Sequence, residues 1–398
     1  MGIEQPDSWK GATMRKEKLQ DLLEWVDGTE GYIRDLLQKV SGYESVIIFG
    51  AGIGGKRTME LLKNNGYEGK IRAFSDNNEG KIGTWYEGYP IVAPDNILEN
   101  CSGTFIILIS STAFKVISQQ LSCLGIDEES IYFFQPAGIS LEDNKDMEFI
   151  KREIVNFETV YDMLADEKSK IIYKSLLNYR ITKKQSWLDE MEAFIDREEL
   201  QYFDHEILKG YCWGEGIVDA GAYTGDTINN FYKFFPDAKG EYYCFEAVKT
   251  IYDQLCMNID YGRRGNIFPF NYAVWDKEGE LRFDVAAYGN GEGSRESSLG
   301  KERVKCSTLD KLLGDKEVDF IKMDIEGAER NALCGGANLI KKNRPVLAIC
   351  IYHKPEDFYD IPLSIEDMVP DEYTYYVRQY RYGQSETVLY AMPNSRKI

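Results

Sequence analysis

Two separate stretches of the sequence alternate between short apolar runs and segments with helical periodicity, and this pattern constrains the fold more than any other feature. The first stretch covers residues 45–134 and the second covers residues 216–393. Strands that alternate with helices form a parallel sheet with helices on its faces. The 398 residues also exceed the usual size of one domain. We therefore expect two α/β domains.

The remaining segments have a helical pattern. Residues 141–184 contain no Gly or Pro and place apolar residues at helical intervals. Residues 16–40 also place apolar residues at helical intervals, with an interruption near Gly28 and Gly31, and we expect these helices to pack on the first sheet. The sequence thus predicts a smaller Rossmann-like α/β domain with leading helices at 1–140, a helical connector at 141–205 and a second α/β domain at 206–398.

The charge balance excludes one class of partner. The chain has 66 Asp and Glu against 47 Lys and Arg, a net charge of −19, whereas nucleic acids are bound chiefly by Lys and Arg. We expect no nucleic-acid partner. The sequence also shows neither a membrane-spanning run nor the apolar core of a signal peptide, which predicts a cytoplasmic protein. Its eight scattered cysteines are interpreted as reduced core residues.

The second α/β stretch begins with the motif VDAGAYTGDT, a strand that runs into a loop with two glycines and then opens a helix. Gly221 and Gly225 would let backbone N–H groups approach a ligand closely. Asp219 at the strand end can meet a cationic group, and Glu246 at the next strand end can accept both hydroxyl hydrogens of a ribose. Four further residues beside these two strand ends are also candidates to contact the ligand, namely Tyr223, Asp226, Thr227 and Ala247. The simpler interpretation is that the glycines only permit a turn and that the acids cap helices.

A series of motifs then resembles a known family. VDAGAYTGDT, FEAV, NYAVWD, STLDKL and IKMDIEGAERNALCGGANLI are similar, in the same order, to the motifs of the FkbM-type methyltransferases, over about residues 215–395. This resemblance implies a class I methyltransferase sheet, S-adenosylmethionine as the cofactor and transfer to an oxygen. The positions that the resemblance assigns to the cofactor are Asp219, Gly221, Gly225, Glu246, Asn271, Ala273 and Asp324.

Methyl transfer to a hydroxyl requires a group that removes the hydroxyl proton, and the candidates are Asp324, Glu326 and His353. After the strand that follows, the family usually has a Glu where this chain reads IYHKPEDF. An imidazole has an unperturbed pKa near 6.5, so we predict His353 as the general base, positioned by Asp324. The alternative is a His that is merely hydrogen-bonded at the strand end.

Metal ligation is a second interpretation of the same acids. Asp324 and Glu326 could together hold a divalent cation, as a carboxylate at this strand end does in catechol-type methyltransferases. Glu329 is the one further acid nearby in the sequence. We therefore assign no metal.

The first α/β stretch carries a G-x-G-x-x-G pattern made by Gly50, Gly52 and Gly55, and Asp76 ends the next strand. The surrounding residues, over about 44–135, resemble the nucleotide-sugar-type Rossmann domains attached to certain sugar acyltransferases and sugar C-methyltransferases. The resemblance implies a site for a sugar nucleotide or a carrier-linked glycan, in an enzyme that decorates surface polysaccharide. An empty scaffold is the alternative.

These observations predict an S-adenosylmethionine-dependent O-methyltransferase. Its expected acceptor is a hydroxyl of a sugar, glycan or secondary metabolite, either free or nucleotide-linked. One alternative is an NAD(P)-dependent oxidoreductase or epimerase that uses the Gly50–Gly55 loop, although the first domain lacks the Tyr-x-x-x-Lys pair that such an enzyme needs. The other alternative is a nucleotide-binding protein without catalytic activity.

Overall fold

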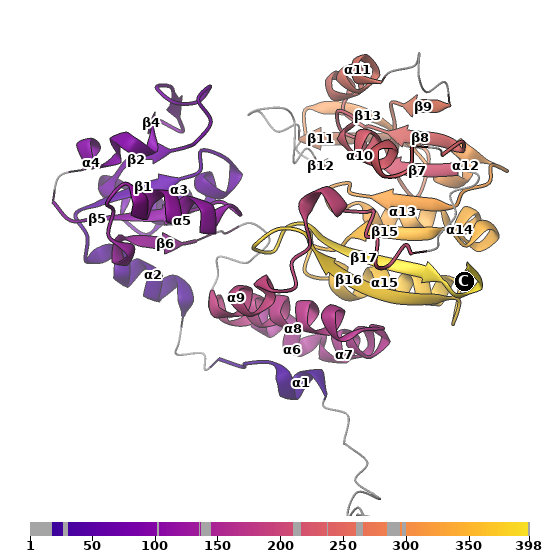
Figure 1. Cartoon of the computed structure of the whole chain (residues 1–398), viewed down its shortest axis with the longest axis horizontal. Coiled ribbons are helices and arrows are strands. Elements are labelled where there is room, and N and C mark those ends of the chain that lie inside the picture. The colour runs from indigo at the N-terminus through magenta and orange to yellow at the C-terminus, as the bar shows by residue number, and fades with distance from the viewer. Residues whose placement is uncertain are drawn as a thin grey trace, which may run out of the picture.

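The computed structural model describes residues 18–26, 31–101, 103–134, 136, 145–209, 216–236, 238–259, 266–284, 295–296 and 300–396. Two α/β units stand side by side, and a layer of helices runs beneath the second unit toward the first (Figure 1). The glycine-rich stretch at residues 288–300 lies almost entirely outside the described residues.

The first unit is a six-stranded sheet in the order β3-β4-β2-β1-β5-β6, parallel except for β3. The order places β1 at the centre, as in doubly wound nucleotide-binding sheets, and all five residues of β1 are buried, as expected for a strand covered on both faces. Its strands are β1 (Ser45–Phe49), β2 (Ile71–Ser75), β3 (Trp85–Tyr86), β4 (Tyr89–Val92), β5 (Phe105–Ile109) and β6 (Ile131–Phe133). Its helical segments are α2 (Tyr32–Ser41), α3 (Ile53–Asn64), η1 (Glu68–Lys70), η2 (Pro94–Asn96), α4 (Ile97–Asn100), α5 (Phe114–Cys123) and η3 (Glu128–Ser130).

The leading helices pack in two different places. Helix α2 buries Ile33, Leu36 and Val40 against the first sheet, as the sequence predicts. Helix α1 (Leu19–Leu22) instead contacts α7 of the connector, so the expectation that both helices cover the first sheet is wrong for α1. The backbone N–H of Glu24 also donates to the side chain of the connector residue Asn178 (2.6 Å).

The connector is helical, but it belongs to the core rather than to the surface. Helix α8 begins after Asp166, whose carboxylate accepts the N–H of Ser169 (2.8 Å), and it packs on β16 of the second sheet. The charged side chains Arg180 and Lys183 are buried there. The connector elements are α6 (Lys145–Arg152), α7 (Ile154–Met163), α8 (Glu167–Thr182), α9 (Ser186–Glu192) and η4 (Glu198–Leu200).

The second unit is a seven-stranded sheet in the order β16-β17-β15-β14-β7-β8-β9. The expected parallel sheet is present from β15 to β9, whereas β17 is antiparallel to both of its neighbours. Its strands are β7 (Gly216–Ala220), β8 (Glu241–Phe245), β9 (Ile267–Phe270), β14 (Phe320–Met323), β15 (Val346–Cys350), β16 (Tyr373–Gln379) and β17 (Thr387–Pro393). Its helices are α10 (Asp226–Phe234), α11 (Lys249–Asn258), α12 (Leu309–Leu313), α13 (Glu329–Gly335), α14 (Ala337–Asn343), α15 (Asp357–Met368) and η5 (Asn394–Arg396).

A small additional sheet covers one end of the second unit. The run at residues 267–276, which looks like one strand in the sequence, is divided between β9 and the short strand β10. Asn271 and Tyr272 leave the large sheet at this point, and Ala273 enters the small one. The strands of the small sheet are β10 (Ala273–Val274), β11 (Gly279–Asp284), β12 (Arg295–Glu296) and β13 (Glu302–Ser307).

The loop between β16 and β17 reaches the first unit, as the yellow hairpin in Figure 1 shows. The ring of Tyr382 in this loop stacks on Phe114 with 6.1 Å between ring centroids, and it meets Phe133 edge-on at 5.7 Å. The two α/β units are thus joined by aromatic packing as well as by the connector.

Two sequence expectations concern the chain as a whole. No helix in the described part of the chain is long and apolar enough to span a lipid bilayer. The described cysteines are free, but Cys123 and Cys334 are exposed, so the expectation that all cysteines are core residues is wrong for these two.

Candidate active site

A pocket opens at the carboxyl ends of the parallel strands of the second unit, where β7 has β14 on one side and β8 on the other. The order of the sheet reverses there, and this is where ligands bind in open α/β sheets. The lining residues are Glu198, Gln201, Tyr202, Gly221, Tyr223, Asp226, Thr227, Phe245, Glu246, Ala247, Ile251, Tyr272, Ala273, Val274, Trp275, Phe283, Lys322, Asp324, Ile325, Glu326, Ala328, Tyr352, Arg381 and Glu386.

The glycine loop needs its glycines for steric reasons. Gly221 has φ +79°, and a Cβ atom there would lie 1.9 Å from the backbone oxygen of Asp324. Gly225 has φ +94° at the start of helix α10. The loop therefore passes directly over the end of β14, and this close approach brings Asp324 to the pocket wall. Of the two glycines, only Gly221 lines the pocket.

Asp219 was expected to contact the cofactor, but the structure places it beneath the pocket. Its carboxylate has no exposure and lies 3.0 Å from the Nζ atom of Lys322, its register partner on β14. The hydroxyl of Tyr242 donates to the same carboxylate (3.0 Å). Burial alone would lower the pKa of Lys322, but the nearby carboxylates, Asp219 first, outweigh burial and raise it above its usual value. Asp219 therefore affects the pocket through Lys322, because it holds that side chain in its charged form and Lys322 lines the pocket.

Glu246 lies at the end of β8 with 8% exposure and faces the pocket. Its carboxylate accepts the backbone N–H groups of Tyr223 (3.1 Å) and Val248 (2.9 Å). Burial raises the pKa of Glu246 to about 7, and these N–H groups oppose the rise only in part. Asn271, another predicted contact, does not line the pocket, and its amide instead holds the carbonyl groups of Glu246 and Ala247 (2.9 and 3.0 Å).

Asp324 ends β14 at the opposite side of the pocket. Its Oδ2 atom accepts the hydroxyl of Tyr202 (2.8 Å), and its Oδ1 atom lies 3.3 Å from the Nε2 atom of His353. Burial alone would raise the pKa of Asp324, but His353 and Lys322 outweigh burial and lower it. The side chain is therefore an ionised carboxylate at neutral pH.

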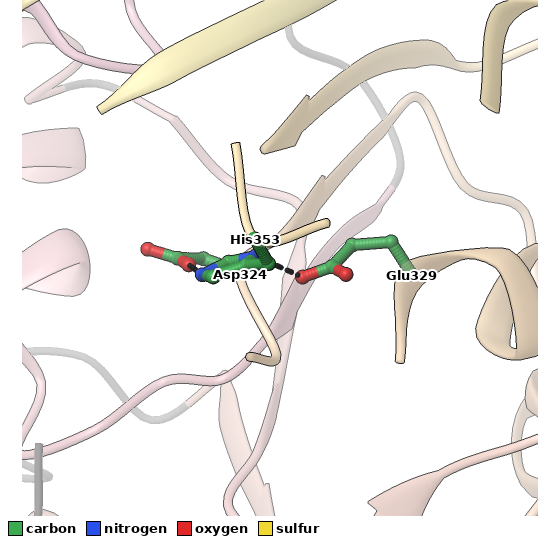
Figure 2. Close-up of side chains that lie close together, drawn as sticks. All are labelled: Asp324, Glu329 and His353. Carbon is green, nitrogen blue, oxygen red and sulfur yellow. Dashed lines mark ion pairs between the residues drawn. The ribbon is translucent and has the colours of Figure 1, made fainter. Parts of the chain in front are cut away.

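His353 lies between carboxylates on both edges of its ring (Figure 2). Its Nδ1 atom is 3.0 Å from Glu329, and its Nε2 atom is also 3.6 Å from Glu326. Burial alone would lower the pKa of His353, but Glu329, Asp324 and Glu326 raise it to about 10. The imidazole is 7% exposed and is not among the pocket-lining residues. A charged imidazole behind Asp324 is placed to position that carboxylate, which favours a carboxylate over His353 as the base.

The sequence offers Asp324 and Glu326, with Glu329 nearby, as the alternative metal ligands. One ligand atom each from Asp324, Glu329 and His353 lie within 4.8 Å of one another. Asp324 and Glu329 flank the ring from opposite edges and face different nitrogens (Figure 2). A doubly protonated ring donates to both carboxylates, and a cation on Nε2 would leave an Nδ1–H that donates to Glu329. The geometry therefore fits an imidazolium held by carboxylates, and the metal interpretation stays its alternative.

Several lining residues were not predicted from the sequence, because they come from segments outside the strand-end motifs. Tyr202 and Gln201 precede β7, and Arg381 and Glu386 belong to the β16–β17 loop. Glu386 has φ +65° and accepts the amide of Gln201 (2.6 Å). Burial and the nearby Asp324 raise the pKa of Glu386. In the sequence, nothing distinguishes this Glu from an ordinary turn residue.

The predicted nucleotide loop of the first unit is internally bonded. Gly50 has φ +111°, and a Cβ atom on Gly55 would lie 2.0 Å from the carbonyl oxygen of Gly50, so both glycines are required by the turn itself. Asp76 accepts the N–H of Ala51 (2.9 Å) and pairs with Lys81 (3.1 Å). A Cβ atom on Gly52 would meet nothing within 4 Å. Ligand binding by this loop stays a prediction.

The strand order of the second unit and the place of its pocket are those of the class I methyltransferase fold. Residues 219–382 match the family model of the methyltransferase FkbM domain, and residues 42–132 match the model described as C2185-like, N-terminal. Residues 219–382 thus match the FkbM methyltransferase domain that the sequence motifs predict, and this match supports an S-adenosylmethionine-dependent methyltransferase.

Solved structures were also compared. A methyltransferase FkbM from Methylobacillus flagellatus KT is 20% identical over 92% of this chain and 95% of its own, with a TM-score of 0.65, and it shares the fold. A putative rRNA methylase from Clostridium thermocellum is 10% identical over 50% of this chain and 96% of its own, with a TM-score of 0.33. No curated protein matches the chain.

Proposed function

We propose that the protein transfers the methyl group of S-adenosylmethionine to a hydroxyl group of a sugar or glycan. The observation that carries this proposal is the gathering of three carboxylates, Asp324, Glu326 and Glu386, at one end of the pocket. A hydroxyl must lose its proton during methylation, and a carboxylate within hydrogen-bond reach can accept that proton. The cofactor supplies an activated methyl group whose leaving group needs no protonation.

The other end of the pocket fits the nucleoside part of the cofactor. Glu246 offers an acceptor for ribose hydroxyls at the end of β8. An apolar wall beside it suits a purine ring, and its members are Ile251, Ala273, Val274 and Phe283. Asp226 also lines the pocket, and its negative charge would stabilise the sulfonium and ammonium groups of the cofactor.

We assign separate roles to the residues at the acceptor end. Asp324 orients the acceptor hydroxyl and accepts its proton, because it lies beside the glycine loop on the wall of the pocket. His353 is a positioning residue. Its positive charge, on the side of Asp324 away from the pocket, keeps that carboxylate ionised. Alignment of donor and acceptor supplies most of the remaining rate acceleration.

The test is transfer of an isotopically labelled methyl group from S-adenosylmethionine to an extract of the cells that encode the protein. We expect label in a carbohydrate product that survives mild alkali, because a methyl ether resists the base that cleaves a methyl ester. Glu246→Ala is the control that should lose donor binding. Label that is released by alkali, or that appears on protein or on an amine, would contradict the proposal.

A further inference from the structure

A second hollow lies between the two α/β units, next to the methyltransferase pocket. It has a volume of about 640 Å³, which is within the range of small-molecule sites. Its walls come from the start of α5 in the first unit, from the connector and from the β16–β17 loop. The lining residues, which we call the interdomain groove, are Thr112, Ala113, Lys115, Val116, Glu192, Ile195, Glu198, Tyr380, Arg381 and Tyr382.

The groove and the methyltransferase pocket share one wall. Glu198 and Arg381 line both hollows, and their side chains form an ion pair with each other. The Nη1 atom of Arg381 also lies 3.7 Å from the Oε1 atom of Glu386, one of the carboxylates at the acceptor end. The groove and the acceptor end of the pocket therefore adjoin at this ion pair.

The groove is held in shape by contacts across the two units. The hydroxyl of Tyr382 donates to Asp189 (2.8 Å), and the Nζ atom of Lys115 pairs with the same carboxylate (2.7 Å). Gln379 fixes the loop from within, because its amide donates to the carbonyl groups of Arg381 and Ser385 (2.7 Å each). A site with fixed walls loses little entropy when it binds a ligand.

The charges of the groove indicate the class of ligand. Its two cations are each paired with carboxylates, Lys115 with Asp189 and Glu192 (3.5 Å), and Arg381 with Glu198 and Glu386. These two cations and four carboxylates together carry net negative charge, which disfavours a diphosphate, but they offer donors and acceptors to neutral hydroxyl groups. Tyr380 and Tyr382 add aromatic rings to the lining. This chemistry suits a neutral polyhydroxylated chain.

We propose that the interdomain groove is an acceptor subsite that binds neutral sugar residues adjoining the one to be methylated. The reacting hydroxyl passes the Glu198–Arg381 pair and meets Asp324 in the pocket. This inference rests on the proposed function, because it assumes a carbohydrate acceptor. It also gives the first unit a role in acceptor binding through the start of α5, separate from the Gly50–Gly55 loop.

The test places a bulky side chain in the interdomain groove and leaves every pocket-lining residue unchanged. Val116 lines the groove, is 68% exposed and is not among the pocket-lining residues, so Val116→Trp adds bulk at little risk to folding. Val155 on α7 is 71% exposed and lines neither hollow, which makes Val155→Trp the matched control. Both full-length variants are compared with wild type in the labelled-methyl assay on the carbohydrate fraction, and donor binding is measured by calorimetry.

We expect Val116→Trp to incorporate label at least about tenfold more slowly than wild type, with donor affinity unchanged and Val155→Trp equal to wild type. Equal labelling by wild type and Val116→Trp would overturn the inference and leave the proposed function standing. Label found only in a nucleotide-linked sugar would overturn the assigned ligand class. A wild-type enzyme that binds the donor but labels no carbohydrate would overturn the proposed function, and the groove assignment would fall with it.

Discussion

The Nδ1 atom of His353 lies 3.0 Å from Oε1 of Glu329, a carboxylate with no solvent exposure. This pair lies behind the pocket wall, and the opposite edge of the ring faces Asp324 (Figure 2). The backbone N–H of Ile325 also donates to Glu329 (2.8 Å), the first residue of helix α13. This hydrogen bond holds the Glu329 carboxylate in place, and the carboxylate in turn orients the imidazole of His353. A series of charged contacts therefore runs from Glu329 through His353 to Asp324. Asp324 is the carboxylate that we place nearest to the reacting methyl group.

The first prediction concerns the pH dependence of donor binding. The pKa of Glu246 is raised to about 7 in the free protein, and the ribose hydroxyls donate to its ionised form. Affinity should therefore rise with pH, by about tenfold between about pH 6 and pH 8. Glu246→Gln should lower affinity by about 1–3 kcal/mol and remove this dependence. Calorimetry over that pH range checks both outcomes, and an equally steep pH dependence in the variant would place the titrating group elsewhere.

The second prediction concerns the buried ion pair between Asp219 and Lys322, whose side chains are 0% and 3% exposed. Lys322→Met leaves the carboxylate uncompensated in the core, so the free energy of unfolding should fall by about 3–5 kcal/mol. Asp219→Asn added to that variant removes the buried charge and should restore part of the loss. Urea unfolding of the two variants is the measurement. The Asp219→Asn single variant completes the cycle, and a loss in the double variant equal to the sum of the two single losses would show that the pair is not coupled.

The third prediction links His353 to stability at alkaline pH. Its pKa is raised from 6.5 to about 10 in the folded protein, so its stabilising contribution is complete below about pH 6.5 and is lost as the pH rises through about 10. Within this window the free energy of unfolding should decrease by at most about 1.4 kcal/mol per pH unit on account of this group. His353→Gln should flatten that slope. Parallel slopes for wild type and variant between about pH 7 and pH 9 would exclude a shifted imidazole.

Much of this site follows from the sequence, and the exceptions have physical causes. The alternation of strands and helices predicts both parallel sheets, and parallel strands bring their carboxyl ends to one edge, where Glu246 and Asp324 do line the pocket. Asp219 differs because its register partner is a lysine. That lysine stands in the apolar run FIKM, and a charge in a buried strand needs a partner. This signal was available in the sequence.

The acceptor end could not be derived in the same way. Tyr202 and Glu386 are 184 positions apart in their numbering, yet both line the pocket, because the hairpin of β16 and β17 folds back over the segment that precedes β7. No local pattern encodes that approach. The charged state of His353 is likewise a tertiary property, since Glu329 at the start of α13 and Asp324 after β14 reach opposite edges of the ring only in the folded chain (Figure 2).

The last prediction separates the two roles that His353 could have in catalysis. As a general base with its ordinary pKa, it would give the rate profile an inflection near pH 6.5. In the structure the imidazole of His353 is charged and does not line the pocket. The wild-type rate profile should therefore lack that inflection and should follow the ionisation of Asp324 instead. His353→Gln removes a cation 3.3 Å from Asp324, which raises the pKa of Asp324 and moves the acid limb of the rate profile to higher pH. Asp324→Asn should lower the rate by about 10²- to 10⁴-fold at every pH at which Asp324 is ionised in the wild type. The labelled-methyl assay measures these profiles once the acceptor is isolated. An inflection near pH 6.5 that is present in wild type and absent from His353→Gln would return the base role to His353.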